Sequence, residues 1–205
     1  RRRQLFEFHE KSWYPRLYRE ITVQTLTEAN ELSGFARALA SPLADAVTSS
    51  GARSVLDLCS GAGGPIALVF GRVQRELSRR GVVDAPRLLL SDLFPNPSDW
   101  QRLVDESSAR LGFVPDPVDA TALPSHLHAD LVTVVNALHH FPPDMVERVL
   151  RAAVERDAAI FIAEGFPRDL VRASAFLPAI GVGFLRSFLR RTRLEKAALA
   201  ATLPA

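Results

Sequence analysis

An acidic residue stands directly before a glycine-rich turn in the stretch from Ser54 to Phe70. The apolar run SVLDL contains Asp57, the turn CSGAGG carries Gly61, Gly63 and Gly64, and a second apolar run follows. Glycines let a ligand approach the backbone closely, and the start of the next helix offers free N–H groups. The pattern therefore predicts a ligand-binding turn between a strand and a helix.

The charge of Asp57 indicates which ligand this turn holds. A dinucleotide would place its pyrophosphate at the helix start, where a nearby carboxylate would repel it. In addition, Ile66 stands where the third glycine of G-x-G-x-x-G belongs, and Pro65 follows Gly64. A ligand with an ammonium and a sulfonium near the carboxylate, and with its own carboxylate facing the helix start, suits the turn better.

Two adjacent histidines follow a later apolar run. Either could be a general base that removes a proton from a substrate hydroxyl, with His140 as the first choice and His139 as the second. Packing, or a hydrogen bond to the backbone, is the alternative role. The five histidines include only this pair and one H-x-H, without matching acids, so the sequence predicts no metal site.

Regularly spaced elements must position these residues. Because the strands are apolar throughout and alternate with helices, they are predicted to form a parallel sheet covered on both faces. Ligands of such sheets bind beyond the carboxyl ends of the strands, where the strand order reverses. Pro115 and Pro117 weaken the third strand. The predicted strands are 54–58, 87–90, 113–118, 130–135 and 158–163. The predicted helices between them are 66–80, a helix that begins at Pro97 or Ser98 and ends at Leu111, and 144–156.

Helical segments flank this alternation. Residues 4–40 are predicted to be helical with a break at Pro15, and a helix over 41–48 is predicted to have Ser41 as its N-cap and Pro42 in its first turn. An apolar but interrupted segment ends the chain. The predicted divisions are an N-terminal helical cap, residues 1–50; the sheet domain, residues 51–168; and a helical tail or lid, residues 169–205.

The motifs, taken in order, resemble those of class I S-adenosylmethionine-dependent methyltransferases. VLDLCSGAGGP resembles their first motif, and LLLSDLFPN resembles the motif of their second strand. PVDATALP resembles the loop after the third strand, ADLVTVVNALHHF the fourth-strand motif of small-molecule enzymes of the quinone-biosynthesis type, and IFIAEGFPR the fifth strand and its exit. The resemblance covers roughly residues 53–168 and implies a Rossmann-like doubly wound sheet of order 3-2-1-4-5.

The resemblance implies S-adenosyl-L-methionine as the cofactor and gives roles to single residues. Asp92 is expected to hold the ribose hydroxyls, Asp119 to meet the adenine amino group, and the Ala120 backbone to lie beside the ring. Cys59 occupies the family's first glycine position, so the turn must tolerate a Cβ atom there. The other residues expected to bind the cofactor are Asp57, Ser60, Gly61, Gly63, Leu93 and Asn136.

These roles have structural alternatives. Asp57 and Asp119 could be plain turn residues, Asp92 could be an N-cap or turn residue before Pro95, and Cys59 could be a small buried filler. The antiparallel sixth and seventh strands of the family are not found in the sequence. The chain is therefore expected to be a shortened one, and it could be inactive if the enzyme needs these strands.

The expected function is methyl transfer to a small apolar acceptor. The sulfonium is already reactive, so holding the nucleophile in line and excluding water supply most of the acceleration. The aromatic residues Trp13, Tyr14 and Tyr18 are predicted to form a substrate lid, with packing on the domain as the alternative. A nicotinamide-dependent oxidoreductase and a non-catalytic methyltransferase-like partner subunit are the alternative functions.

Composition bears on location and partners. The chain has 205 residues with a net charge of +2, and its one cysteine excludes an internal disulfide and fits a reducing cytoplasm. No apolar run of about eighteen residues predicts a transmembrane helix. The scattered basic residues predict no nucleic-acid partner. Membrane contact by the tail is less favoured than a buried helix.

Overall fold

The computed structural model describes residues 15–107, 109–165 and 177–189, which fall into two compact units. The first unit contains the described residues from Phe35 to Gly165, and the second contains α1 (Arg16–Leu32) and α7 (Leu177–Leu189). Helix α2 (Phe35–Ser50) belongs to the first unit, although the sequence analysis places it in the N-terminal cap. Its buried residues Leu43, Ala44 and Val47 are part of the core beneath the sheet.

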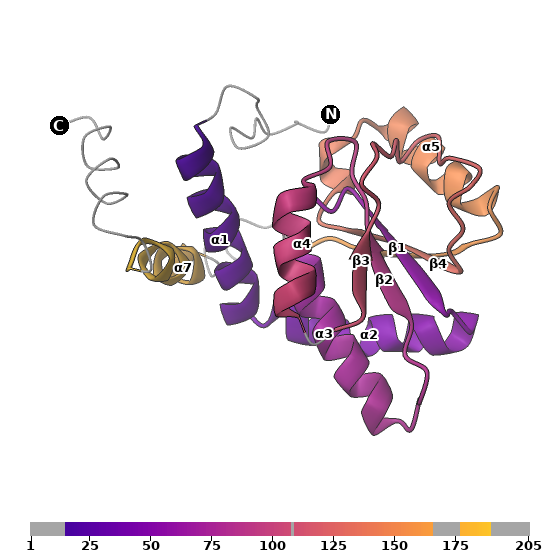
Figure 1. Ribbon diagram of the computed structural model, residues 1–205, viewed down its shortest axis with the longest axis horizontal. Helices are drawn as coiled ribbons and strands as arrows, with labels where there is room; N and C mark the ends of the chain where they lie inside the picture. The colour runs from indigo at the N-terminus through magenta and orange to yellow at the C-terminus, as the bar shows by residue number, and fades with distance from the viewer. Residues whose placement is uncertain (1–14, 108, 166–176, 190–205) are drawn as a thin grey trace. The chain divides into compact units, whose positions relative to one another are not determined.

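Parallel strands form the sheet of the first unit in the order β3-β2-β1-β4-β5 (Figure 1). The central strand β1 places Asp57 opposite Leu90 of β2 on one side and opposite Thr133 of β4 on the other. The strand order therefore reverses at β1, and the predicted Rossmann-like fold with order 3-2-1-4-5 is confirmed. The strands are β1 (Ser54–Leu58), β2 (Arg87–Leu90), β3 (Leu111–Phe113), β4 (Leu131–Val135) and β5 (Ala159–Ala163).

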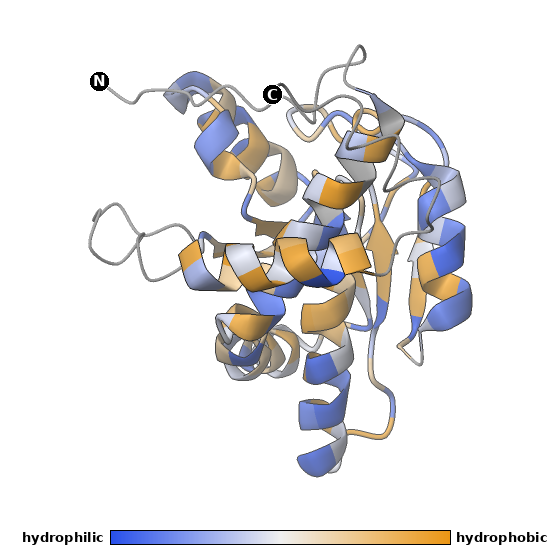
Figure 2. Cartoon of the chain, turned by 90° about the vertical axis from the view of Figure 1, so that its left-hand side faces the viewer, coloured by the Kyte–Doolittle hydropathy of each residue, from blue (hydrophilic) through white to orange (hydrophobic). Residues whose placement is uncertain are grey.

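Helices cover both faces of this sheet. Helices α2, α3 (Gly64–Arg79) and α4 (Pro97–Glu106) pack on one face, and α5 (Pro143–Val154) packs on the other (Figure 1). Successive strand residues alternate between two cores, so that Val55 faces α2 and α3 whereas Leu56 lies in the cluster with α5. Burial on both faces explains why the strand residues are mainly apolar, as the orange colour of the central strand visible in Figure 2 illustrates.

Proline accounts for one difference from the predicted elements at the start of the first unit. Pro42 lies inside α2, which extends from Phe35 to Ser50, and does not mark the first turn of a helix over 41–48. A proline inside a helix removes one backbone hydrogen bond. Leu43 and Ala44, both fully buried, follow Pro42 directly. The tertiary packing of this helix face therefore outweighs the local cost of the proline.

The third strand is shorter than predicted and begins earlier. It covers only Leu111–Phe113, and the preceding helix α4 ends at Glu106 instead of continuing to residue 111. Pro115 and Pro117 carry no N–H, so a regular ladder cannot continue past them. The chain still runs beside β2, because Val114 N donates to the Leu90 carbonyl oxygen at 2.9 Å.

In the second unit, α1 and α7 pack closely against each other. A Cβ atom built on Gly183 of α7 would lie 2.7 Å from the carbonyl oxygen of Thr25 in α1, so the two backbones approach directly. The Ser187 hydroxyl donates to Gln24 Oε1 at 2.9 Å. Helix α1 begins directly after Pro15, where the sequence predicts a break. Within the described part of the chain, no helix is both long and apolar enough to cross a membrane.

Candidate cofactor site

The turn between β1 and α3 is built from left-handed backbone. Cys59, Gly61 and Gly63 have φ angles of 58°, 53° and 77°. Glycine adopts this region freely, whereas a residue with a Cβ atom pays roughly 1–2 kcal/mol for it. The turn therefore tolerates a Cβ atom at Cys59, as the sequence analysis required, at a conformational cost.

Gly63 has no room for a side chain. A Cβ atom there would lie 2.8 Å from Leu90 Cδ1, 2.9 Å from Leu103 Cδ1 and 3.0 Å from Trp100 Cδ1. Trp100 is fully buried, and its indole N–H donates to the Gly61 carbonyl oxygen at 2.9 Å. The shape of the turn and the packing of α4 are therefore coupled.

Replacing Gly63 by alanine is expected to lower the free energy of unfolding by about 3 kcal/mol, because overpacking adds to left-handed strain. Urea denaturation measures this change. The matched control is Gly81→Ala, since Gly81 has a φ of 79° but nothing within 4 Å of the new Cβ atom. An equal loss of stability in both variants would show that strain alone, without close packing, matters at Gly63.

The Asp57 carboxyl lies inside a network of hydroxyl groups. It is 2% exposed, Thr133 Oγ1 donates to its Oδ1 at 2.7 Å, and Ser60 Oγ donates to its Oδ2 at 2.7 Å. Burial raises the pKa of Asp57 to about 7, although the hydrogen bonds from Ser60 and Thr133 act to lower it. A cation placed beside this carboxyl would favour its charged form.

Asp92 ties the end of β2 to the glycine turn. Its Oδ2 accepts a hydrogen bond from Gly61 N at 2.9 Å, and its Oδ1 accepts one from Phe94 N at 2.9 Å. It does not cap α4, because the N-cap is Asn96, whose side chain accepts from Asp99 N. Each carboxylate oxygen can accept a second hydrogen bond, so the ribose role stays a prediction that this geometry permits.

Asp119 and Ala120 follow the short third strand. Asp119 is exposed, and its Oδ1 accepts hydrogen bonds at 2.8 Å from both the N–H and the hydroxyl of Thr121. This is the local turn geometry typical of aspartate. Its other carboxylate oxygen has no protein partner among the described residues, and it could accept a bond from a ligand amino group. Ala120 is 6% exposed.

A histidine–glutamate pair connects the ends of β4 and β5. His139 Nδ1 lies 2.7 Å from Glu164 Oε2. Burial opposes the charge of Glu164, but the hydrogen bond with His139 and the charge of that ring hold the pKa of Glu164 below its ordinary value. The His140 ring lies beside His139, with ring centroids 3.9 Å apart. An Nδ1–H donated to Glu164 makes Nε2 the basic nitrogen of His139.

Asn136 shapes the backbone that leads to these histidines. It is left-handed, with a φ of 54°, and its Oδ1 accepts a hydrogen bond from Gly165 N at 2.5 Å. The side chain therefore joins the exits of β4 and β5. Its predicted contact with the cofactor stays a prediction.

The sheet brings most of the predicted site residues to one edge. Asp57 lies in the last two residues of β1, and the turn up to Gly63 follows it. Asp92 follows the end of β2, and Asn136 with the two histidines follows β4. Leu93 is 49% exposed beside Asp92. Of the predicted lid, Tyr18 lies half-buried in α1 of the second unit. Trp13 and Tyr14 lie outside the described residues.

Sequence reasoning missed three partners of these residues. Thr133 is a polar residue in the apolar run LVTVV, and Glu164 directly follows β5. The sequence pattern around each of these two residues could therefore have indicated a role in the site. No sequence pattern indicates the contact of Trp100, because only the fold brings α4 to the glycine turn. As for metal ions, the described residues contain no group of three or more His, Cys, Asp or Glu side chains that could hold one.

Neither a family model nor a curated protein matches this sequence. Solved structures do match. The PH0226 protein from Pyrococcus horikoshii is 19% identical with a TM-score of 0.54, over 83% of this chain and 70% of that chain. Human N-acetylserotonin methyltransferase in complex with SAM is 14% identical with a TM-score of 0.50, over 80% of this chain and 44% of that chain.

This chain has the Rossmann-like fold of these structures. An O-methyltransferase family protein from Burkholderia thailandensis also matches, with 22% identity and a TM-score of 0.40, over 63% of this chain and 40% of that chain. This chain thus spans less than half the length of the human and the Burkholderia proteins. At such identities the likeness establishes the Rossmann-like fold.

Proposed function

We propose that this chain is an S-adenosylmethionine-dependent methyltransferase domain that acts on a small molecule. One observation supports this most strongly: the glycine turn with a buried carboxyl, the acid after β2 and the His139–Glu164 pair all lie at the carboxyl edge of one sheet. Ligands of doubly wound sheets bind at this edge. The human protein of the same fold is named as a methyltransferase in complex with SAM.

The residues of the turn fit the amino-acid end of S-adenosylmethionine. Helix α3 has Gly63 as its N-cap and no side-chain hydrogen bond at its start, so backbone N–H groups there can receive a carboxylate. Asp57 stands at the other side of the turn, where an ammonium would favour its charged form. The turn therefore offers one partner for each charge of the cofactor's amino-acid end.

Residues that follow β2 and β3 would bind the nucleoside end of the cofactor. Asp92 would accept from the ribose hydroxyls, and the exposed apolar side chain of Leu93 suits one face of the adenine ring. Asp119, with its second carboxylate oxygen, would accept from the adenine amino group. Bound S-adenosylmethionine supplies an activated methyl group, so this chain must mainly orient the acceptor and exclude water.

The His139–Glu164 pair favours an acceptor that loses a proton. Glu164 holds the imidazole in one tautomer and stabilises the positive ring that forms when Nε2 takes a proton. A small-molecule hydroxyl is the acceptor that this chemistry fits. The geometry favours His139 as the base over His140, because the contact with Glu164 at 2.7 Å belongs to His139.

Isothermal calorimetry with S-adenosylhomocysteine and with NADH tests the proposal. Saturable binding of the first without binding of the second is expected, because the carboxyl at the turn disfavours a pyrophosphate. The reverse preference would replace the proposal with a nicotinamide-dependent oxidoreductase. Cofactor binding without methyl transfer to any acceptor in a broad screen would favour a non-catalytic partner subunit.

The Asp92→Ala variant is expected to bind S-adenosylhomocysteine at least about tenfold more weakly, because hydrogen bonds to a charged group contribute about 1.5–3 kcal/mol. Calorimetry gives the dissociation constant. Asp105→Ala is the matched control, since Asp105 is exposed on α4 and bonds only Gln101 among the described residues. Equal affinity of both variants would remove Asp92 from the cofactor site.

A further inference from the structure

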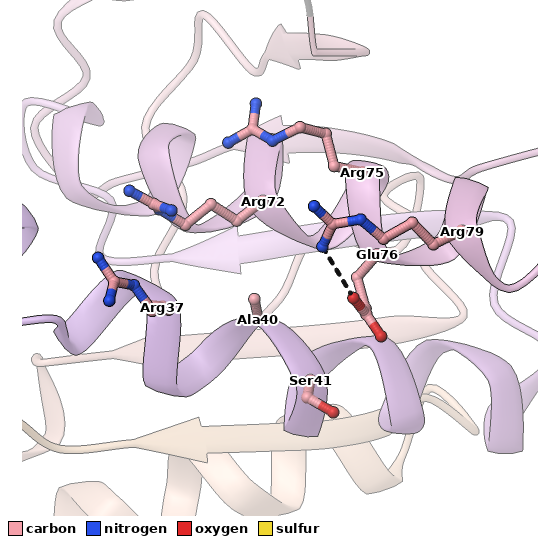
Figure 3. Close-up of a pocket in the computed structure, with 7 residues that line it drawn as sticks. All are labelled: Arg37, Ala40, Ser41, Arg72, Arg75, Glu76 and Arg79. Atoms are coloured by element: carbon pink, nitrogen blue, oxygen red, sulfur yellow. Dashed lines mark hydrogen bonds and ion pairs between the residues drawn. The ribbon is translucent and has the colours of Figure 1, made fainter.

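A small cavity between α2 and α3 is lined mainly by arginines. Its volume is about 190 Å³, and Figure 3 shows Arg37 extending from α2 and Arg72, Arg75 and Arg79 from α3. Ser41 and Glu76 also line it. The lining residues of α3 all lie in its second half, away from the turn at its N-terminus, so the cavity is distinct from the candidate cofactor site.

The positive charge of this cavity is only partly balanced. Glu76 is its one lining acid, and it already accepts hydrogen bonds from Arg80 Nε at 3.0 Å and from Arg79 Nη1 at 3.4 Å. Arg80 also donates to Asp45 at 2.6 Å. Within residues 15–107, 109–165 and 177–189, Arg37 and Arg75 are exposed and form no ion pair with an acid. At least two of the arginines that line the cavity therefore have no acidic partner among the described residues.

The spacing of these arginines concentrates like charges on one helix face. Arg72, Arg75 and Arg79 are three and four residues apart, which places their side chains above one another. Like charges at these spacings destabilise a helix. A bound anion would remove this repulsion, and the planar guanidinium fork matches the oxygens of a phosphate.

Two smaller residues of α2 shape the cavity for such an anion. The Ser41 hydroxyl oxygen accepts from Arg80 Nη2 at 3.0 Å, which leaves its O–H to donate. Ala40 lines the cavity with a single methyl group, so its size preserves the space between the helices. The site thus combines charge, a neutral donor and room for a compact group.

We propose that this cavity binds a phosphate group. The phosphate would belong either to a soluble phosphorylated molecule or to the phosphate monoester headgroup of a lipid. Both present the same compact, doubly charged oxyanion to the arginines. The site would act independently of the cofactor, so binding of S-adenosylhomocysteine should be unchanged when the arginines are replaced.

Calorimetric titration of the full chain with inorganic phosphate at low ionic strength tests the site. Saturable binding is expected for the wild-type protein, and Arg37→Gln with Arg75→Gln should weaken it at least about tenfold, because charge-assisted bonds are lost. Both side chains are exposed, so the fold should survive. The matched control is Arg148→Gln with Arg151→Gln on α5, which removes the same charge elsewhere. Equal weakening in both double variants, or no binding by the wild type, overturns the proposal.

A second pair of variants separates the cavity from surface charge. Ala40→Leu fills the space while all arginines remain, and it should abolish phosphate binding. Ala38→Leu places the same side chain at an exposed position of α2, and it should leave binding intact. Phosphate binding that survives Ala40→Leu overturns the assignment to this cavity.

Vesicle sedimentation distinguishes the two sources of the phosphate. Capture by vesicles containing phosphatidic acid, but not by pure phosphatidylcholine vesicles, assigns a lipid headgroup if the Arg37→Gln, Arg75→Gln variant is not captured. Binding of inorganic phosphate without vesicle capture assigns a soluble ligand. Capture that the double variant retains counts against the cavity as the lipid site.

Discussion

At pH 8 the Asp57→Asn variant is expected to be more stable than the wild-type protein, by on the order of 4 kcal/mol. The reason is that burial raises the pKa of Asp57 from 3.8 to about 7. Asparagine keeps the shape and can still accept from Thr133 and donate to Ser60 Oγ. It carries no charge, so it does not incur the cost of ionising a buried carboxyl.

The direction in which stability changes with pH follows from the protonation of Asp57 in the folded and the unfolded chain. Below about pH 4 the Asp57 carboxyl is protonated in both the folded and the unfolded chain, and it contributes no slope. Between about pH 4 and pH 7 the unfolded chain loses this proton while the folded chain keeps it, so stability falls as pH rises. Above about pH 7 the Asp57 carboxyl is ionised in both the folded and the unfolded chain, and the loss of stability is complete.

Urea denaturation of the wild type and of Asp57→Asn across this pH range measures the effect as a difference. Asp130 and Glu164 have lowered pKa values and act in the opposite direction, but they are present in both proteins and cancel. Asp105→Asn is the control at an exposed acid. A pH-independent difference between wild type and Asp57→Asn would show that Asp57 is not a buried carboxyl of raised pKa.

The same carboxyl links stability to the proposed function. If the cofactor's ammonium lies beside Asp57, binding converts a partly protonated carboxyl to its charged form and releases a proton near neutral pH. The heat of S-adenosylhomocysteine binding should then depend on the ionisation enthalpy of the buffer. The bound ligand would thus offset the free-energy cost of ionising the buried Asp57 carboxyl.

The central sheet could be predicted because its signals are local and repeated. The runs at β1 and β2 are mainly apolar and have an acid near their end, Asp57 and Asp92, and their bounds agree with the prediction to the residue. The rule that ligands meet the carboxyl ends of parallel strands then placed Asp57, Asp92 and the histidines at one edge. Periodicity and topology were sufficient for this much.

The remaining differences arise from contacts between distant segments. The local sequence around Pro42 predicts the start of a helix. Only the buried face of α2 explains why the helix continues through this residue. Trp100 contacts Gly61 of the glycine turn, 39 residues away in sequence, and no sequence pattern predicts that contact. Likewise, the motif NALHH does not say which histidine meets Glu164, because that depends on the exit angle of β5.

That contact carries the second large prediction. His139→Ala is expected to reduce kcat by about a hundredfold to ten-thousandfold, the range for loss of a general base, while the affinity for S-adenosylhomocysteine stays nearly unchanged. The acceptor for this assay is chosen by screening hydroxyl-bearing small molecules for transfer from methyl-labelled S-adenosylmethionine. His140→Ala is the matched control, because the His140 ring lies beside His139 but the contact with Glu164 belongs to His139.

Glu164→Gln separates positioning from packing. Glutamine keeps a hydrogen-bonding partner for His139 Nδ1 but removes the negative charge that stabilises the protonated ring, so kcat should fall less than in His139→Ala. The acidic limb of the pH–rate profile should move to lower pH, since the neutral base persists further into acid. A structural role alone would lower stability without moving this limb. A larger loss of kcat in His140→Ala than in His139→Ala would assign the proton transfer to His140 and reduce the His139–Glu164 pair to a bridge between β4 and β5.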